Sequence, residues 1–469
     1  MFLNKIFKGK GKGKDEDKYL GEVVLPPERP RDRRYEDAEP QPPRPPVDKG
    51  VSAPLDEFAW DFFDAAADGN TIFSPFGLYS ALGMLANAAE EGSPELDELL
   101  KAMHSDSLGS INEAVEAMLP VFPKGVLFRS SNLVLVSSGL LQNGVGIDDG
   151  YRQVVAKTFG GDVTEADFQK NLKGVKKDIS KWVSERTEKM IPDYKSVVNE
   201  YTVTDILNAV CFKSLWASPF DHDKTRPETF TSADGSESKV KMMHQTERFV
   251  FGLHEGEKYR GLRMGYGAKG SDAVMLLVIP SDPSDLDILE SWKSETPEFR
   301  REFLDDVMSA RRAYVSLSLP VLSMSADYDL KDVFEMMGMT RLASGEPGFT
   351  RMLNGFPLAF GSGKHEALVK VDEDGTEAAA VTEMSILSGC CPPDDEPVRF
   401  RCNIPYLFVI ADSHTGAYLF VGYVGTLEGK ERRSHLRVGK EADREQGEVY
   451  DSPLVSHHVR FGQFHSRLY

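Results

Sequence analysis

The side chains that most often do chemistry in proteins are present in this chain but form no catalytic motif. The 469 residues include 10 histidines and 4 cysteines, yet there is no G-x-S-x-G turn, no H-E-x-x-H pair and no Walker loop. The stretch 361–364 lacks the upstream Gly and the following Ser or Thr that a phosphate-binding loop needs. The cysteines lack C-x-x-C spacing. We therefore expect no catalytic centre, no metal and no cofactor.

One segment, 376–387, carries a pattern with a physical meaning of its own. Alternate residues of a strand point to opposite faces of a sheet. The even positions are Thr376, Ala378, Ala380, Thr382, Met384 and Ile386, and the odd positions include the carboxylates Glu377 and Glu383. One face is therefore small and apolar, while the other is charged.

This pattern suits a strand that slips between two existing strands, because the buried face carries no charge and the ladder meets no proline. Pro392 is the first proline after residue 376, and Gly375 can take the backbone angles that a hinge requires. On the pattern alone, an ordinary exposed loop or a short Ala-rich helix over 376–384 remains open.

The elements that must position this segment are mixed in type. Apolar spacing predicts helices over 55–66 and 78–89, and Ser74-Pro75 is a typical start signal before the second. Apolar and β-branched runs predict strands over 126–136, 206–212, 273–279, 315–319, 368–371, 406–410 and 417–424. Helices concentrate early and strands late, which indicates an α+β fold.

The ends of the chain differ from its middle. Residues 1–52 are rich in Lys/Gly and Pro/Arg and are expected to be a disordered tail, followed by a domain over 53–427 and a polar C-terminal extension over 428–469. The formal net charge is −19, and the acidic excess lies in the middle of the chain. A nucleic-acid partner is not expected, because phosphate binding needs clustered Lys and Arg.

Compartment signals in the sequence are weak. The N-terminus lacks the long apolar core of a signal peptide, and no apolar run is long enough to span a membrane. We therefore favour a cytoplasmic or nucleocytoplasmic monomer, with non-classical secretion as an alternative.

At this point the chain resembles a known family, the serpins. The segment from Glu373 to Ala380, reading EDGTEAAA, is similar to the family's hinge, and NAVCFKSLWASPF over 208–220 is similar to its strand-3A segment. Further matches are Phe73-Ser74-Pro75, Trp182-Val183, Leu317 to Pro320, and Asn403 to Phe408, and the resemblance covers residues 53–427 in consistent order.

The resemblance implies a serpin fold of three β-sheets and about nine helices, with an exposed reactive-centre loop. A target serine protease would cleave that loop, which would then insert into the central sheet and trap the acylated protease. The expected function is a suicide-substrate inhibitor, favouring chymotrypsin-like or elastase-like targets; the alternative is a non-inhibitory serpin acting as chaperone, carrier or store. An enzyme is not expected.

Site residues carry over from the resemblance individually. The hinge would comprise Glu373, Gly375, Thr376, Glu377, Ala378, Ala379, Ala380 and Thr382. Ser74, Asn208 and His365 match the polar cluster that controls sheet opening, and Trp216 matches a residue at the top of the sheet, where insertion begins with Glu373. Counting from Thr376 places the reactive bond between Gly389 and Cys390, with Leu387 and Ser388 as the alternative.

Some residues depart from the family pattern. Gly77 stands where a second Ser often supports the polar cluster, and the stretch from the hinge to Pro405 is longer than in compact members. Residues 95–120 carry only Lys101 as a basic residue besides His104, so we predict no heparin binding.

Overall fold

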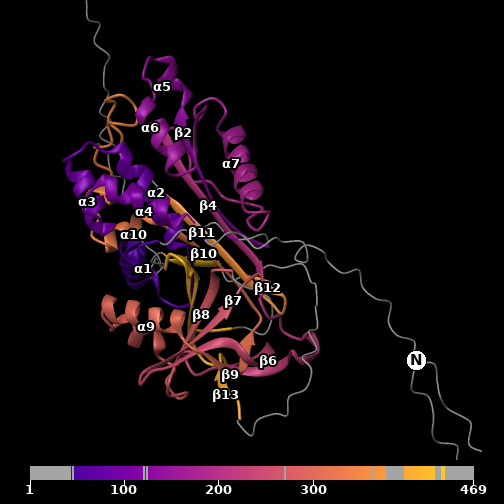
Figure 1. Cartoon of the computed structure of the whole chain (residues 1–469). Coiled ribbons are helices and arrows are strands. Elements are labelled where there is room, and N and C mark those ends of the chain that lie inside the picture. Colours follow the sequence, from indigo (N-terminus) through magenta and orange to yellow (C-terminus); the bar gives the residue numbers. More distant parts are fainter. Residues whose placement is uncertain are drawn as a thin grey trace, which may run out of the picture.

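The computed structural model describes residues 44, 47–119, 122, 125–268, 271–361, 363–376, 396–427 and 435–438 (Figure 1). Within these residues there are eleven α-helices and two short 3-10 helices. The helices are α1 (Ala53–Ala66), α2 (Pro75–Ala88), α3 (Pro94–Ala102), α4 (Leu108–Met118), α5 (Ser138–Gln142), α6 (Asp149–Lys157), α7 (Leu172–Arg186), α8 (Ile288–Lys293), α9 (Pro297–Ser309), α10 (Leu330–Met336), α11 (Thr340–Ser344), η1 (Lys49–Ser52) and η2 (His222–Lys224).

Helix α2 begins where a side chain satisfies a free backbone N–H group of its first turn. Ser74 caps α2 by accepting a hydrogen bond from the N–H of Gly77, and Pro75 occupies the first helical position. The predicted helices over 55–66 and 78–89 are therefore observed as α1 and α2, with starts shifted by two or three residues.

Seven strands form the first sheet, in the order β16-β10-β11-β12-β4-β2-β3. They are β2 (Val126–Ser137), β3 (Asp162–Ala166), β4 (Thr204–Leu215), β10 (Leu322–Asp329), β11 (Lys364–Val371), β12 (Gly375–Thr376) and β16 (His435–Val438). The short β12 lies between β11 and β4 and is antiparallel to both.

The other nine strands form a second sheet, in which eight follow the order β1-β15-β14-β8-β7-β6-β9-β13 and β5 pairs with β6. They are β1 (Thr71–Phe73), β5 (Arg226–Thr231), β6 (Glu237–Glu255), β7 (Tyr259–Gly265), β8 (Ala273–Pro280), β9 (Arg312–Pro320), β13 (Val398–Arg401), β14 (Tyr406–Asp412) and β15 (Tyr418–Val424).

The described residues thus form two sheets, and the expected third is not seen as a separate sheet. The reason is β6, whose 19 residues pair with β5 and β9 along most of their length and with β7 at the end. A register shift between Arg248 and Phe251 bends this strand without breaking it. The expectation of helices early and strands late also holds only in part, because α8 to α11 lie in the second half.

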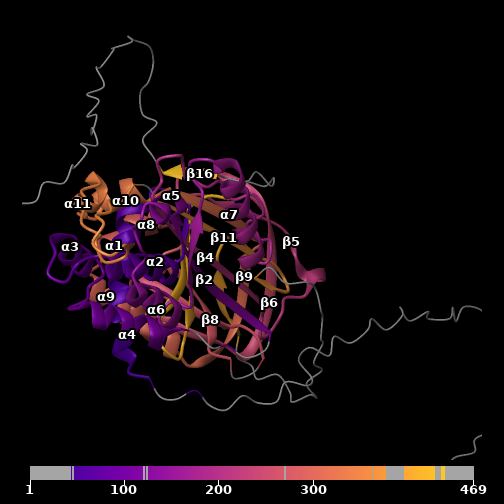
Figure 2. The same ribbon diagram turned by 90° about the horizontal axis from the view of Figure 1, so that it is seen from above.

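Helices cover both faces of the seven-stranded sheet (Figures 1 and 2). On one face, Val175, Ile179 and Val183 of α7 pack with Leu207 and Ala209 of β4 in a small apolar cluster. The other face belongs to the main core, which α1 and α2 share with both sheets. The seven-stranded sheet is therefore buried on both sides over much of its length.

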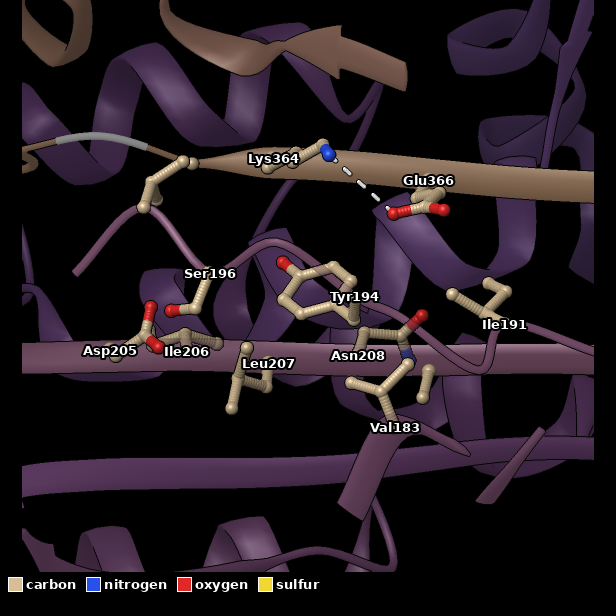
Figure 3. Close-up of a pocket in the computed structure, with 13 residues that line it drawn as sticks. Val183, Ile191, Tyr194, Ser196, Asp205, Ile206, Leu207, Asn208, Lys364 and Glu366 are labelled. Carbon is tan, nitrogen blue, oxygen red and sulfur yellow. Dashed lines mark ion pairs between the residues drawn. The ribbon is translucent and has the colours of Figure 1, made fainter. Parts of the chain in front are cut away.

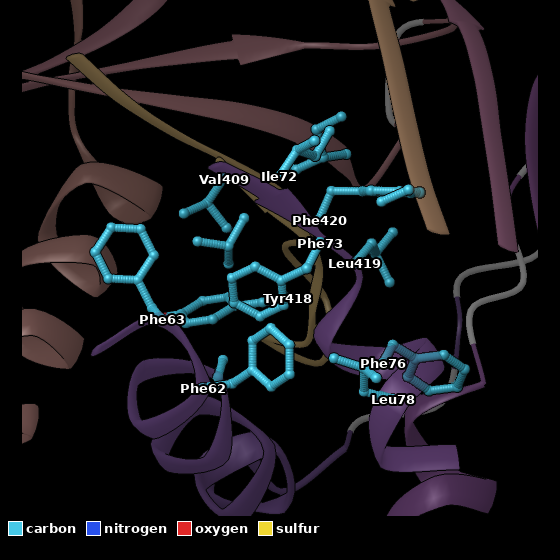
Figure 4. Close-up of a cluster of buried hydrophobic side chains, with 14 of the residues drawn as sticks. Phe62, Phe63, Ile72, Phe73, Phe76, Leu78, Val409, Tyr418, Leu419 and Phe420 are labelled. Atoms are coloured by element: carbon cyan, nitrogen blue, oxygen red, sulfur yellow. The ribbon is translucent and has the colours of Figure 1, made fainter. Parts of the chain in front are cut away.

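The centre of the main core is aromatic (Figure 4). The ring of Phe62 on α1 lies 4.6 Å from that of Phe73 on β1 and 5.5 Å from that of Tyr328 on β10. These contacts join the first helix to both sheets.

Described parts of both extensions touch this body. The guanidinium of Arg44 donates to Asp412 at 2.8 and 2.9 Å, and β16 pairs in parallel with β10. The division at residues 52 and 427 stays a prediction. In the part of the chain that the structure describes, no helix has the length and apolarity to cross a membrane.

Replacing Phe62 by Ala should lower the free energy of unfolding by about 3–5 kcal/mol, because a fully buried ring is removed from three aromatic neighbours. Urea unfolding followed by circular dichroism measures the change. The control Met336→Ala, on a side chain that is 55% exposed, should stay within about 0.5 kcal/mol. Equal effects of the two variants would contradict this view of the core.

Candidate functional site

The hinge begins with a tight turn between β11 and β12. The carboxylate of Asp372 accepts hydrogen bonds from the N–H groups of Asp374 and Gly375, both at 3.1 Å, and the N–H of Asp372 donates to the carbonyl of Gly375 at 2.9 Å. This short local network reverses the chain and places Gly375 and Thr376 between two strands.

Only glycine fits at the first position of β12. A Cβ atom on Gly375 would lie 2.0 Å from the carbonyl oxygen of Ser214 and 2.7 Å from the Cα of Leu215. Both obstacles are backbone atoms of β4, which cannot rotate away as a side chain could. The close approach of hinge and β4 therefore depends on the missing side chain at residue 375.

Thr376 contacts one of a pair of stacked aromatic side chains, Tyr266 and Trp216, on the core side of the sheet. Its hydroxyl lies 2.6 Å from the phenol oxygen of Tyr266, and its exposed fraction is 1%. The ring of Tyr266 stacks on that of Trp216 with centroids 4.3 Å apart. The side chain of Thr376 thus points into the core.

Backbone hydrogen bonds fix the hinge turn to the segment that follows β4. The N–H of Trp216 donates to the carbonyl of Asp374, and the N–H of Phe220 donates to that of Glu373, each at 2.8 Å. The indole N–H of Trp216 donates to the carbonyl of Asp372 at 2.9 Å. The structure therefore brings Trp216 and Glu373 to one place, as the resemblance implied.

A histidine adds charge to this contact. Nε2 of His222 lies 3.1 Å from a carboxylate oxygen of Asp374, and its Nδ1 lies 4.0 Å from one of Glu373. The hydrogen bond to Asp374 and the surrounding negative charges raise the pKa of His222 above 6.5. Protonation of His222 therefore strengthens the attachment of the hinge.

Beyond Thr376, toward the first residues of β4 and β11, the sheet is split. Among the described residues, β4 and β11 make no ladder with each other, and β12 pairs with β4 at Gly375 and Thr376 and with β11 at Thr376 alone. Figure 3 shows the ring of Tyr194, from the segment between α7 and β4, lying between Lys364 and Glu366 on β11 and Asn208 on β4. We refer to the gap between β4 and β11 as the slot.

The predicted polar cluster is divided by the slot. On the β11 side, Nε2 of His365 accepts from the N–H of Ser74 at 3.0 Å, and the hydroxyl of Ser74 donates to the carbonyl of Leu419 at 2.7 Å. Complete burial lowers the pKa of His365 to about 3, so its ring is neutral at physiological pH.

On the other side of the slot, Asn208 bonds within its own half of the sheet. Its amide nitrogen donates to Ser130 at 2.9 Å and to Asn132 at 2.8 Å, both on β2. Its carbonyl oxygen is buried and has no hydrogen-bond partner among the described residues. No hydrogen bond in the described part of the chain links Asn208 to Ser74 or His365.

Several predicted residues lie outside the described residues: Glu377, Ala378, Ala379, Ala380, Thr382, Leu387, Ser388, Gly389 and Cys390. Sequence reasoning missed Tyr266, His222 and Asp372. Asp372 could have been found from its place directly before the hinge, as an acceptor that often caps turns. Tyr266 carries no local signal, since it is 110 residues away from Thr376.

Comparisons with known proteins agree with this architecture. Residues 54–426 match the family described as Serpin (serine protease inhibitor). An uncharacterized serpin-like protein of Thermococcus kodakarensis is 30% identical over 80% of this chain and 85% of its own length. Human Serpin B4 is 27% identical over 78% of this chain and 96% of its own length.

Two solved structures illustrate the likeness in fold. The native thermophilic serpin tengpin matches with a TM-score of 0.69 at 23% identity, over 83% of this chain and 97% of its own. Thyroxine-binding globulin in complex with thyroxine matches with a TM-score of 0.67 at 22% identity, over 81% of this chain and 100% of its own. At these identities the two structures support the fold alone.

Replacing Gly375 by Ala should expel β12 from its place, because the new Cβ overlaps the backbone of β4. We expect a loss of about 1–3 kcal/mol in hinge pairing, seen as faster hydrogen exchange in peptides covering 372–376. Gly361→Ala is a matched control, since its Cβ would meet no atom within 4 Å. Unchanged exchange in the Gly375 variant would contradict the close approach described.

The attachment of the hinge should depend on pH through His222. Because its folded pKa is raised above the unfolded value, its stabilising contribution is full below about pH 6.5 and is lost as pH rises through the folded pKa. The thermal midpoint of the chain should exceed that of His222→Gln in acid, and the difference should vanish in base. Asp374→Asn should remove the same pH dependence. A difference that is constant with pH would count against this contact.

Proposed function

The chain belongs to the serpin family, and from that premise we propose that it is a suicide-substrate inhibitor of serine proteases. The observation that carries this proposal is the place of β12. Gly375 and Thr376 already occupy the top of a strand position between β4 and β11, and the two strands stay apart below it. A cleaved loop could therefore lengthen β12 into a full strand.

The register of β12 tells which residues would meet. If β12 is continued past Thr376 in the same register, Thr382 comes opposite Asn208 on β4 and His365 on β11. The carbonyl oxygen of Asn208 is buried without a partner, and a threonine hydroxyl is a donor. Insertion would therefore place a small polar group where the two halves of the polar cluster face each other across the slot.

In the same register, the acidic face of the segment would also meet partners of opposite charge. Glu377 would come opposite Lys213 on β4 and Lys370 on β11, and Glu383 would come opposite Lys364 on β11. Opposite charges on neighbouring strands contribute roughly 0.2–1 kcal/mol each. The two carboxylates of the segment thus meet lysines on the α7 face, while the small residues face the core.

Insertion of the loop would be driven by the formation of a new strand between β4 and β11. Filling the slot adds backbone hydrogen bonds along two strands that are otherwise unpaired there. The native chain would then be trapped kinetically above the inserted form until a protease cuts the loop. We propose Gly389-Cys390 as the bond that is cut, with Leu387-Ser388 as the alternative, and a chymotrypsin-like or elastase-like target.

A carrier or store is the second candidate, because thyroxine-binding globulin shares the fold. The two functions differ in what loop cleavage does. In an inhibitor, cleavage allows insertion and raises the thermal midpoint by many degrees, whereas in a non-inhibitory protein it leaves the midpoint unchanged.

Incubation with chymotrypsin-like and elastase-like proteases should give a covalent complex that survives denaturing electrophoresis. Ala378→Arg should convert the chain into a substrate that is cleaved without complex formation, because in an inserted strand it would place a charge on the same core side as Thr376. Ala379→Arg, the same change on the opposite face, should leave complex formation largely intact. The insertion proposal would be contradicted if every protease cleaved the chain without forming a complex. It would also be contradicted if the two variants behaved alike.

A further inference from the structure

A buried acidic site in the nine-stranded sheet is occupied by an arginine of the N-terminal extension. Asp412, the last residue of β14, has a side chain with an exposed fraction of 0%. Nη1 and Nη2 of Arg44 donate to its two carboxylate oxygens at 2.8 and 2.9 Å, and Nη1 also lies 3.4 Å from a carboxylate oxygen of Asp272. The guanidinium is therefore held between two carboxylates. We refer to Asp412 and Asp272 together as the acidic site.

Residues next to Asp412 orient its carboxylate for this contact. The hydroxyl of Thr415 donates to one oxygen at 3.0 Å, and the N–H of His414 donates to the other at 3.2 Å. Both donors are uncharged, so they fix the carboxylate in place without neutralising it. The positive charge that Arg44 brings compensates for the burial of this carboxylate.

The geometry of the contact favours a guanidinium over an ammonium group. A planar guanidinium donates two parallel hydrogen bonds to one carboxylate, as Arg44 does here, whereas a lysine ammonium has no such fork. Because Asp412 is buried, removing its partner would leave an uncompensated charge away from water, which is more costly than the loss of an exposed ion pair. The acidic site should therefore select arginine, and an empty site should destabilise the folded body.

The acidic site joins two turns of the nine-stranded sheet. Asp412 stands opposite Ala273 in the pairing of β14 with β8, and the carbonyl of Asp272 accepts from the N–H of Ser413 at 2.8 Å. Arg44 thus links the turn that follows β14 to the turn that leads into β8. Without the guanidinium, two carboxylates that both lie within 3.4 Å of one nitrogen would repel each other at this junction.

The connection between β7 and β8 also contacts the hinge. The N–H of Tyr266 donates to the carbonyl of Ala273 at 2.9 Å, and its phenol oxygen lies 2.6 Å from the hydroxyl of Thr376. The N–H of Gly267 donates to the carbonyl of Leu215, the last residue of β4, at 2.8 Å. Residues of one connection therefore contact the acidic site at one end and β12 at the other.

We propose that the acidic site is a binding site for an arginine in a proline-rich segment, and that its occupation holds β12 in the sheet. In this chain the segment belongs to the N-terminal extension, where Arg44 stands between Pro43 and Pro45. The extension is then a ligand of the folded body, which an arginine segment added from outside can replace. This inference goes beyond the proposed function, because it holds with or without a protease.

The test uses the full chain carrying Arg44→Ala and two added peptides, acetyl-PPRPP-amide and acetyl-PPKPP-amide. The first reproduces residues 42–46, and the second has lysine in place of arginine. Calorimetry with millimolar peptide should show that the arginine peptide binds Arg44→Ala at least about tenfold more tightly than the lysine peptide does. The unsubstituted chain should bind the arginine peptide at least about tenfold more weakly, because Arg44 already fills the site.

Thermal unfolding measures the effect of the charge that is left behind. Arg44→Ala should lower the thermal midpoint by about 3 °C or more, and the arginine peptide should restore part of the loss. Adding Asp412→Asn should abolish peptide binding and raise the midpoint again, because the buried charge disappears together with its partner. The control Arg226→Ala, at a side chain that is 64% exposed, should shift the midpoint by less than about 1 °C.

Hydrogen exchange tests the link to β12. In Arg44→Ala, exchange in peptides covering 372–376 should be faster by about threefold or more, and the arginine peptide should slow it again. Exchange in α7, which packs in the separate apolar cluster on the other face of the seven-stranded sheet, should not change. If Arg44→Ala does not fold alone, refolding with the arginine peptide but not with the lysine peptide is the corresponding result.

Three results would overturn the inference. They are absence of binding or refolding with the arginine peptide, peptide binding that Asp412→Asn leaves intact, and unchanged exchange over 372–376 in a folded Arg44→Ala chain. None of these measurements involves a protease. Failure of the chain to form a protease complex would therefore count against the proposed function and leave this inference standing.

Discussion

The separation of β4 from β11 is the constraint on which the rest of the structure depends. Two neighbouring strands that do not pair leave backbone donors and acceptors facing each other, which a sheet normally avoids. Here β12 satisfies them only at the top, through Gly375 and Thr376. The ring of Tyr194 lies at the α7 face below, and a cavity lies at the core face. The sheet is thus built with room for one more strand.

The polar contacts around the slot are arranged so that opening it breaks few hydrogen bonds. Ser74 and His365 bond to each other on one side, while Asn208 bonds to β2 on the other. Each half of the cluster is held separately, and the described residues show no hydrogen bond across the gap within it. Attachment is concentrated instead at the hinge turn, where Trp216 holds the backbone from the β4 side. The position between β4 and β11 is therefore occupied and hydrogen-bonded at one end, and the described residues show no strand pairing along the rest of it.

The sequence could predict those parts of the fold whose signals are local. The helix starting at Ser74-Pro75 follows from a capping serine and a proline, and strands over 406–410 and 417–424 follow from continuous apolar runs. The polar β6 was not predicted, because its neighbours rather than its own composition make it a strand. Fusion of two expected sheets into one follows from that same strand. Tyr266 was missed because it meets Thr376 only through the fold.

By itself, the sequence determined that the segment after Gly375 has one small apolar face and one acidic face, because strand periodicity depends only on the order of residues. It also determined the family, through motifs that lie in consistent order along the chain. Only the tertiary structure decided that Thr376 points inward, since that depends on its contact with Tyr266. It alone decided that β4 and β11 stand apart, because this feature joins residues far apart in the chain.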